Sequence, residues 1–430
     1  MDIKILLSKI SGGEFDSAFS YLYGEENIAE AKNRYAKAVN AFSESYPEIK
    51  DVSLYSAPGR TEVSGNHTDH NHGRVLAASV NLDVIAVAGK SGDNIARVKS
   101  EGFDEDIVDL EDFIPNQDEF GRSSSLIRGI AARFTELGYP VGGFCAYTTS
   151  TVLKGSGLSS SAAFETLIGT ILNYEYASGK VDAVEIAKIG QFAENVFFGK
   201  PCGLLDQTAS SVGSFVAIDF ENPEKPIIEK IAFDFAKSGY ALCIVDTGGN
   251  HADLTGDYAS VPMEMKAVAE ALGGKTLKEV GKEAFYKALP DLHSTLSDRA
   301  LLRAIHFFNE DERAATAAEA LKKNDFEEFK NIIIDSGKSS FTYLQNVYTC
   351  KNPDEQGLSL ALALAEDILK GKGAYRVHGG GFAGTIQSFV PNELLGEFKE
   401  TMEAIFGENH CYCLKIRPVG GIKVSEALGK

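Results

Sequence analysis

The sequence predicts a protein of mixed α and β structure with two domains that meet near residue 220. Its 430 residues allow two or three domains at about 150 residues each. Some segments are short apolar runs between glycine- and asparagine-rich turns, which is typical of strands. In others, apolar residues recur every three or four positions, which is typical of amphipathic helices. The acidic stretch 221–229 contains two prolines and is the predicted connection between the domains.

The spacing of apolar residues and turn residues assigns the elements in chain order. The helix predicted over 26–45 repeats apolar residues at helical intervals and ends at the break before Pro47. The other predicted elements are strands within 52–98 around a polar loop at 59–73, a helix at 123–137, a strand at 144–149, a Gly/Ser loop at 154–161 leading into an alanine-rich helix, a helix at 183–198, a further element at 203–211, a strand at 240–246, helices between 263 and 338, and a closing glycine-rich strand region at 374–390.

Composition excludes several classes of function. The chain has 42 Lys and Arg against 61 Asp and Glu, a net charge of −19, which disfavours binding to nucleic acid or to anionic membranes. None of its six cysteines forms a CxxC pair, as expected of free thiols in a reducing cytoplasm. No apolar run approaches the ~18 residues of a membrane span, and the first residues lack the apolar core of a signal peptide. We therefore expect a soluble cytoplasmic protein, a monomer or weak homo-oligomer, that acts on small molecules.

The segment 153–163, LKGSGLSSSAA, is the strongest candidate for a ligand site. Small residues let backbone amides approach a ligand, and the helix that follows offers its unpaired N-terminal amides, which suits a phosphate group. The segment lacks the GK[ST] ending of a Walker A loop, and Ser160 stands where a dinucleotide fingerprint needs glycine. A flexible serine-capped loop is the alternative interpretation.

The polar loop 59–73, GRTEVSGNHTDHNHG, allows two chemical interpretations. The side chains of His67, Asp69, His70 and His72 are of the kinds that bind zinc. Their order, HxDHxH, differs from the metallo-hydrolase order HxHxDH, and HExxH is absent. A loop dense in Asn, His and Asp also matches the donors and acceptors that sugar hydroxyls need. A solvated turn is the third possibility.

A third segment, 379–384, contains three consecutive glycines after a predicted strand, which alone would mark any tight hairpin. In order and separation, these three segments resemble the motifs of the GHMP kinase family, and within it those of the galactokinases. Between them, AE at 193–194 and PCGLLDQ at 201–207 resemble the family's AEH and PCGIMDQ. The resemblance covers about residues 55–390. The family motifs GRxNLxGEHTDYNxG and GxRMTGGGFGG are retained at Gly59, Arg60, Gly65, His67, Thr68, Asp69, Asn71 and Gly73, and at Arg376 and Gly379 to Gly381.

The resemblance implies an α+β fold of two domains with the active site between them. The N-terminal domain, residues 1–220, would resemble the second domain of ribosomal protein S5 and carry the sugar and phosphate loops. The C-terminal domain, residues 221–430, would be ferredoxin-like. The implied activity is an ATP-dependent sugar 1-kinase that converts D-galactose to galactose 1-phosphate.

The resemblance also implies roles for individual residues. Asp206 would be the base that takes the proton of the anomeric hydroxyl, and Arg60 would stabilise the transition state. Ser161 and Glu194 would hold Mg²⁺. The sugar contacts would be Arg60, Asn66, His67, Asp69, Gly203, Asp206 and Tyr258. The ATP phosphates would lie against Gly155, Ser156, Gly157, Leu158, Ser159, Ser160, Ser161, Gly380 and Gly381.

Departures from the family pattern gather in the sugar loop. Asn66 replaces the glutamate with which the family contacts the sugar near C6, His70 replaces a tyrosine, and TEVS at 61–64 replaces VNLI. They keep open a kinase for a galactose derivative, galacturonate or N-acetylgalactosamine. A non-catalytic galactose and ATP sensor on the same fold and a zinc hydrolase are the alternatives from other classes.

Overall fold

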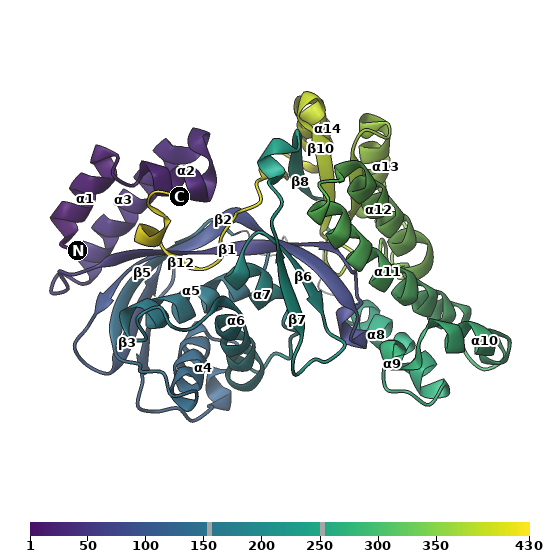
Figure 1. The fold of residues 1–430 in the computed structure, drawn as a ribbon, viewed down its shortest axis with the longest axis horizontal. Helices are drawn as coiled ribbons and strands as arrows, with labels where there is room; N and C mark the ends of the chain where they lie inside the picture. The colour runs from purple at the N-terminus through teal and green to yellow at the C-terminus, as the bar shows by residue number, and fades with distance from the viewer. Residues whose placement is uncertain (153–156, 250–253) are drawn as a thin grey trace.

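The computed structural model describes residues 1–152, 157–249 and 254–430, which form two β-sheets covered by helices (Figure 1). In the first sheet the strand order is β12-β1-β2-β5-β3-β4, with β6 paired to β2 and β7 to β6. Its strands are β1 (Ser53–Ser64), β2 (Arg74–Lys90), β3 (Ile95–Ser100), β4 (Glu105–Asp109), β5 (Phe144–Ser150), β6 (Phe215–Asp219), β7 (Ile227–Ile231) and β12 (Ile422–Lys423). The second sheet is antiparallel in the order β11-β8-β10-β9. Its strands are β8 (Tyr240–Asp246), β9 (Ala374–Val377), β10 (Thr385–Pro391) and β11 (Cys411–Leu414).

Helices cover both faces of the first sheet (Figure 1). One face carries α4 (Ser123–Glu136), α5 (Ser160–Glu175), α6 (Ala183–Phe192) and α7 (Leu205–Val212), and the other carries α1 (Ile3–Gly12), α2 (Asp16–Tyr23) and α3 (Ile28–Ser45). The predicted helix 26–45 is confirmed as α3, whose apolar face is buried against the sheet through residues such as Tyr35 and Phe42. Helices α1 and α2 were not predicted from the sequence.

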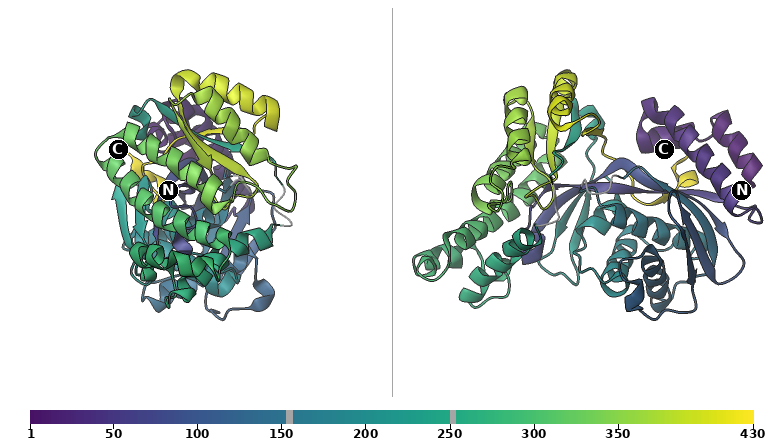
Figure 2. Two further views of the ribbon diagram at one scale, coloured as in Figure 1. Left: turned by 90° about the vertical axis from the view of Figure 1, so that its right-hand side faces the viewer. Right: turned by 180° about the vertical axis from the view of Figure 1, so that it is seen from behind.

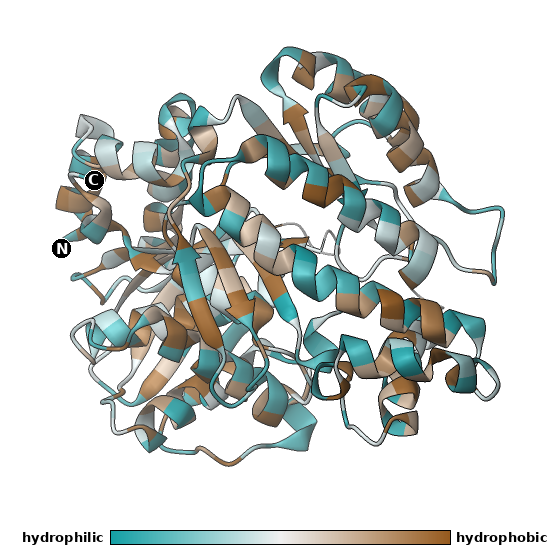
Figure 3. Ribbon diagram, turned by 45° about the vertical axis from the view of Figure 1, so that its right-hand side comes forward, coloured by the Kyte–Doolittle hydropathy of each residue, from teal (hydrophilic) through white to brown (hydrophobic). Residues whose placement is uncertain are grey.

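The second half of the chain supplies a helical layer and the smaller sheet (Figure 2). Its helices are α8 (Thr255–Ala271), α9 (Leu277–Val280), α10 (Lys282–His293), α11 (Asp298–Lys322), α12 (Phe326–Ser339), α13 (Gly357–Leu369) and α14 (Leu395–Phe406). Apolar and polar residues alternate along these helices (Figure 3), as expected of helices that cover a core with one face. Phe329 of α12 lies between Phe215 of the first sheet and Phe389 of the second, with ring centroids 6.4 and 5.1 Å away, so one core joins the two halves.

Two features differ from the expected organisation. Residues 59–64 belong to β1 and only 65–73 form the loop, because Thr61 and Val63 are buried in alternation with the polar Arg60 and Glu62. The first sheet also continues past residue 220, since β7 pairs with β6, and the chain returns to it at the end, where β12 pairs with β1. The division into 1–220 and 221–430 remains a prediction. No helix among the described residues is long and apolar enough to span a membrane.

Candidate active site

An arginine–aspartate pair stands at the centre of the predicted site. Arg60 of β1 donates from Nε to Asp206 Oδ1 at 2.6 Å and from a terminal nitrogen to Oδ2 at 2.5 Å, a two-point contact. Asp206 lies in the first turn of α7, 146 residues further along the chain. Burial acts to raise the pKa of Asp206, but the Arg60 guanidinium outweighs it and the pKa is lowered. The Asp206 carboxylate is therefore ionised at neutral pH.

The end of the predicted phosphate loop contacts the same arginine. The Arg60 guanidinium donates to the Gly157 carbonyl oxygen, and the Arg60 amide donates to the Leu158 carbonyl oxygen at 3.0 Å. Ser159 has a φ of +55° and precedes α5. No side chain of a described residue caps this helix end, so the first amides are available to bind an anion. Ser160 and Ser161 lie in that first turn. Gly155 and Ser156, also predicted to bind phosphate, lie outside the described residues.

A buried group of carboxylates and amides lies next to this turn. Glu194, in the short π-helical segment Ala193–Phe198, accepts from Lys200 Nζ at 3.0 Å and from Gln207 Nε2 at 2.8 Å. The same Gln207 nitrogen donates to Glu165 Oε2 at 3.0 Å. Burial, and then the neighbouring Glu194 carboxylate, raise the pKa of Glu165 well above its usual value. Glu165 Oε1 and Gln207 Oε1 are buried and have no hydrogen-bond partner within the part of the chain that the structure describes, so the group has spare oxygen ligands of the kind that Mg²⁺ prefers.

The polar loop brings together three of the predicted sugar contacts. A Cβ atom added to Gly203 would lie 3.4 Å from Asp69 Oδ2, so these two residues are neighbours although 134 positions separate them. His67 Nε2 donates to the Gly380 carbonyl oxygen at 3.1 Å, and burial lowers the His67 pKa to about 4, which keeps the ring neutral. This bond uses one of the two ring nitrogens of His67. No metal-ligand cluster of His or Asp side chains is found in this loop among the described residues.

The glycine-rich segment 379–384, here called the glycine turn, borders the site and comes from the second half of the chain. Tyr258 of α8 donates its hydroxyl to the Gly381 carbonyl oxygen at 2.9 Å, and a Cβ on Gly380 would come within 2.7 Å of its ring. Such a contact tolerates only glycine. His378, just before the turn, lies near the phosphate loop, because a Cβ on Gly157 would be 3.3 Å from its ring. The turn therefore lies between the predicted sugar contacts and the phosphate loop.

The side chain of Asn66, another predicted sugar contact, makes hydrogen bonds to several protein groups. Its side chain is buried, and its Nδ2 donates to the Gly379 carbonyl oxygen at 2.7 Å and to Glu62 Oε1 at 3.0 Å. Its Oδ1 accepts from Asn346 at 2.9 Å and from Ser340 at 3.3 Å. Both ends of the amide are used within the protein, so Asn66 joins the sugar loop to the glycine turn. Its contact with the sugar stays a prediction.

Glu62 is a candidate residue that the sequence analysis did not single out. It is on the same side of β1 as Arg60, two positions away, and its Oε1 accepts from Arg376 at 3.1 Å and from Asn66. No described residue donates to its Oε2, and 14% of the side chain is exposed. Burial raises the pKa of Glu62, while Arg376 acts in the opposite direction. The family pattern has asparagine at this position and glutamate at position 66, so the two side chains are exchanged in this chain. This exchange is the sequence feature that could have identified Glu62 as a site residue.

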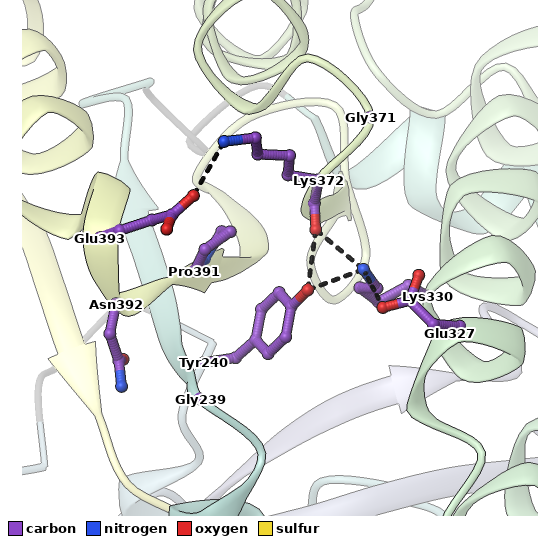
Figure 4. A pocket seen from close by; sticks show the side chains of 9 residues that line it. All are labelled: Gly239, Tyr240, Glu327, Lys330, Gly371, Lys372, Pro391, Asn392 and Glu393. Atoms are coloured by element: carbon purple, nitrogen blue, oxygen red, sulfur yellow. Dashed lines mark hydrogen bonds and ion pairs between the residues drawn. The ribbon is translucent and has the colours of Figure 1, made fainter.

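A hollow of about 600 Å³ lies apart from these residues (Figure 4). It is lined by the start of β8 and the end of β10, where Tyr240 pairs with Pro391, whereas the glycine turn adjoins the other end of the same strand pair. Its polar groups contact one another: Lys330 Nζ donates to the Tyr240 hydroxyl at 2.7 Å, and Lys372 pairs with Glu393 at 2.8 Å. None of the predicted site residues lines it.

Comparison with protein families gives two matches. The galactokinase galactose-binding signature matches residues 40–90, which include the polar loop. The N-terminal domain of the GHMP kinases matches residues 125–214, which include the phosphate loop and Asp206.

Comparison with individual proteins also finds galactokinases. A galactokinase from Glaesserella parasuis serovar 5 (strain SH0165) is 31% identical over 82% of this chain and 88% of its own length. One from Streptomyces coelicolor is 32% identical over 77% and 83%. In fold, the chain is similar to Lactococcus lactis galactokinase complexed with galactose (TM-score 0.74, 23% identity, 91% of this chain and 100% of that one). It is also similar to Methanococcus jannaschii mevalonate kinase (TM-score 0.60, 15% identity, 85% and 98%), which confirms the predicted GHMP kinase fold.

Proposed function

The chain belongs to the galactokinase family of GHMP kinases, and we propose that it transfers the γ-phosphoryl group of ATP to the anomeric hydroxyl of galactose. The products are galactose 1-phosphate and ADP. One observation carries this proposal: the Arg60 guanidinium donates hydrogen bonds to Asp206 and to the carbonyl oxygen of Gly157 at the same time. That arrangement places a carboxylate and a cation next to the helix end where phosphate would bind.

Asp206 serves as the proton acceptor in this proposal. As the γ-phosphoryl group reaches the sugar, the anomeric oxygen forms the new P–O bond and loses its proton to the carboxylate. Because Arg60 keeps the pKa of Asp206 low, the carboxylate is a weak base. It is suited to orienting the hydroxyl and to accepting its proton late in the phosphoryl transfer. The loose transition state of phosphoryl transfer needs positioning and charge neutralisation more than a strong base. Arg60 supplies positive charge there.

ATP binds in this proposal with its phosphates against the start of α5 and the glycine turn. The free amides of the first turn and the hydroxyls of Ser160 and Ser161 are the expected donors. Ser161 and Glu194 would hold Mg²⁺, and the unpaired oxygens of Glu165 and Gln207 beside them support a cation there. When bound, Mg²⁺ neutralises charge on the β- and γ-phosphates. Lys200, which now pairs with Glu194, would keep that carboxylate compensated when the cation is absent.

The sugar contacts in this proposal are His67, Asp69, Gly203 and Tyr258, with Glu62 in addition. The neutral His67 ring and the Asp69 carboxylate offer a donor and an acceptor to vicinal hydroxyls. Gly203 leaves room for the ring beside Asp69. The unpaired Oε2 of Glu62 provides the carboxylate that position 66 lacks, so we infer that galactose itself, with its hydroxyl at C6, remains the substrate. A carboxylated sugar such as galacturonate would be repelled by Glu62.

The test is ADP release by the purified protein with Mg²⁺-ATP against galactose, galacturonate, N-acetylgalactosamine, glucose, homoserine and mevalonate. We expect turnover on galactose and a much lower value of kcat/KM for the other five. Faster turnover on galacturonate or N-acetylgalactosamine would contradict the role given to Glu62. Binding of galactose and ATP without turnover would make the chain a sensor. Because the reaction uses ATP and the cysteines are free thiols, we propose the cytoplasm as its compartment.

A further inference from the structure

Three cysteines gather in the smaller sheet, outside the proposed active site. Cys243 of β8 is the register partner of Cys413 of β11, and Cys411 lies two residues before Cys413. Because side chains alternate along a strand, all three thiols project from the same face of the sheet. Cys243 and Cys411 are buried and Cys413 is exposed. Alternation along two strands therefore gives a cluster that no sequence motif would reveal.

The sulfur atoms have the spacing of a metal site. All three Sγ atoms lie within 4.8 Å of one another, and Cys243 and Cys413 are 3.9 Å apart. At a Zn–S bond length of about 2.3 Å, two sulfurs at the tetrahedral angle are separated by about 3.8 Å. A metal ion at the centre could thus reach all three sulfurs with little change in the backbone. A disulfide between Cys243 and Cys413, by contrast, would require the sulfurs to approach to about 2.05 Å.

We propose that Cys243, Cys411 and Cys413 form a binding site for a thiophilic metal ion of the zinc(II) class. Three thiolates are a ligand set that selects soft or borderline cations over Mg²⁺, so the site would not compete for the cation of the kinase reaction. Each thiol that binds gives up its proton, and the exposed side at Cys413 leaves a fourth position for water.

The expected consequence is stabilisation of the second half of the fold. An ion bound here would tie β11, at the edge of the smaller sheet, to β8. The chain after β11 returns to the first sheet, where Arg417 contacts the buried Asp83 at 3.1 Å. Holding β11 therefore also anchors this return segment. None of the three cysteines contacts the Arg60–Asp206 pair or the sugar loop among the contacts described, so turnover need not depend on the ion.

The experiment is a titration of the full-length, reduced and chelator-treated protein with Cd²⁺ and then Zn²⁺, in excess Mg²⁺. The sulfur-to-cadmium charge-transfer band reports thiolate binding, and carboxylates of the kinase site do not produce it. We expect one ion per chain, displacement of Cd²⁺ by Zn²⁺, and a higher Tm with metal. Cys413→Ser should weaken binding at least about tenfold. Cys350→Ser, which removes an exposed thiol outside the cluster, should leave binding unchanged.

Cys413 is the residue of choice because it is exposed, so we expect its serine variant to fold like the natural protein, with equal Tm values in the absence of metal. Three outcomes would overturn the proposal. One is the absence of a charge-transfer band in the natural protein. The second is an unchanged band in Cys413→Ser. The third is a Cys243–Cys413 disulfide in protein purified without oxygen. Each leaves the kinase proposal intact, since that is measured by ADP release.

Discussion

Replacing Asp206 by asparagine tests the proposed mechanism most directly. Asparagine keeps the size of the side chain and one oxygen for Arg60, but it removes the negative charge and the capacity to take a proton. Loss of a general base lowers kcat by about 10² to 10⁴, which corresponds to about 2.7 to 5.4 kcal/mol of the activation free energy. We expect a kcat in that lower range, with KM for ATP changed by less than about threefold.

The fold should tolerate this change. The Asp206 side chain is 35% exposed, so water screens the pair with Arg60 and its loss should lower the free energy of unfolding by only about 1 kcal/mol. A large fall in activity therefore reflects the chemistry and not unfolding. Because the pKa of Asp206 is lowered from its ordinary value of about 3.9, its protonation should not reduce kcat of the natural protein between pH 5 and 8.

The assay is steady-state ADP release with galactose, combined with thermal unfolding of each variant. Asp234→Asn is the matched control, because Asp234 pairs with Lys237 on the surface at 2.9 Å and is 55% exposed. The control should behave like the natural protein in both measurements. A kcat for Asp206→Asn within about threefold of the natural value would refute the role of Asp206 as proton acceptor.

Three other carboxylates can be tested by amide substitutions. Glu62→Gln should raise KM for galactose about tenfold while KM for ATP stays constant, since a hydrogen bond to a charged group contributes about 1.5 kcal/mol; an unchanged KM for galactose would remove Glu62 from the sugar site. Glu194→Gln should increase the Mg²⁺ concentration needed for half-maximal turnover, measured by titration at fixed ATP; an unaltered midpoint would exclude Glu194 as a ligand. Asp83→Asn should lower the free energy of unfolding by about 3 kcal/mol, because it leaves the buried Arg417 and the adjacent Arg34 without their carboxylate. Burial acts to raise the Asp83 pKa, but the two arginines lower it, so its stabilising effect is complete above pH about 4 and is lost as pH falls through the lowered pKa, which denaturant unfolding across pH would show.

Several elements could be predicted from local patterns. The helix at 123–137 and the strand at 144–149 correspond to α4 and β5 within a residue at each end, because apolar spacing reports which face is buried. The polar residues of 59–64 predict a loop, since Arg60 and Glu62 are charged. Their alternation with buried Thr61 and Val63 is the pattern of a strand with one polar face.

The candidate site was only partly predictable, since side-chain direction depends on distant contacts. The amide side chain of Asn66 is of a kind that binds sugar hydroxyls. In the structure, this amide forms hydrogen bonds with Asn346 and with the Gly379 carbonyl oxygen. Glu62 lies in a strand, and no described residue donates a hydrogen bond to its Oε2. Neither orientation is encoded in the loop itself, because both depend on residues 280 to 314 positions away.

By itself, the sequence determined the family and the short motifs on which that assignment depends. Short glycine, serine and histidine patterns impose their backbone and donor chemistry locally, so they can be recognised without a structure. Only the tertiary structure decided which side chains meet: Arg60 with Asp206, Glu62 with Arg376, and Cys243 with Cys413. Strand register and core packing bring these partners together across 146 to 314 positions, and such pairing depends on the whole fold.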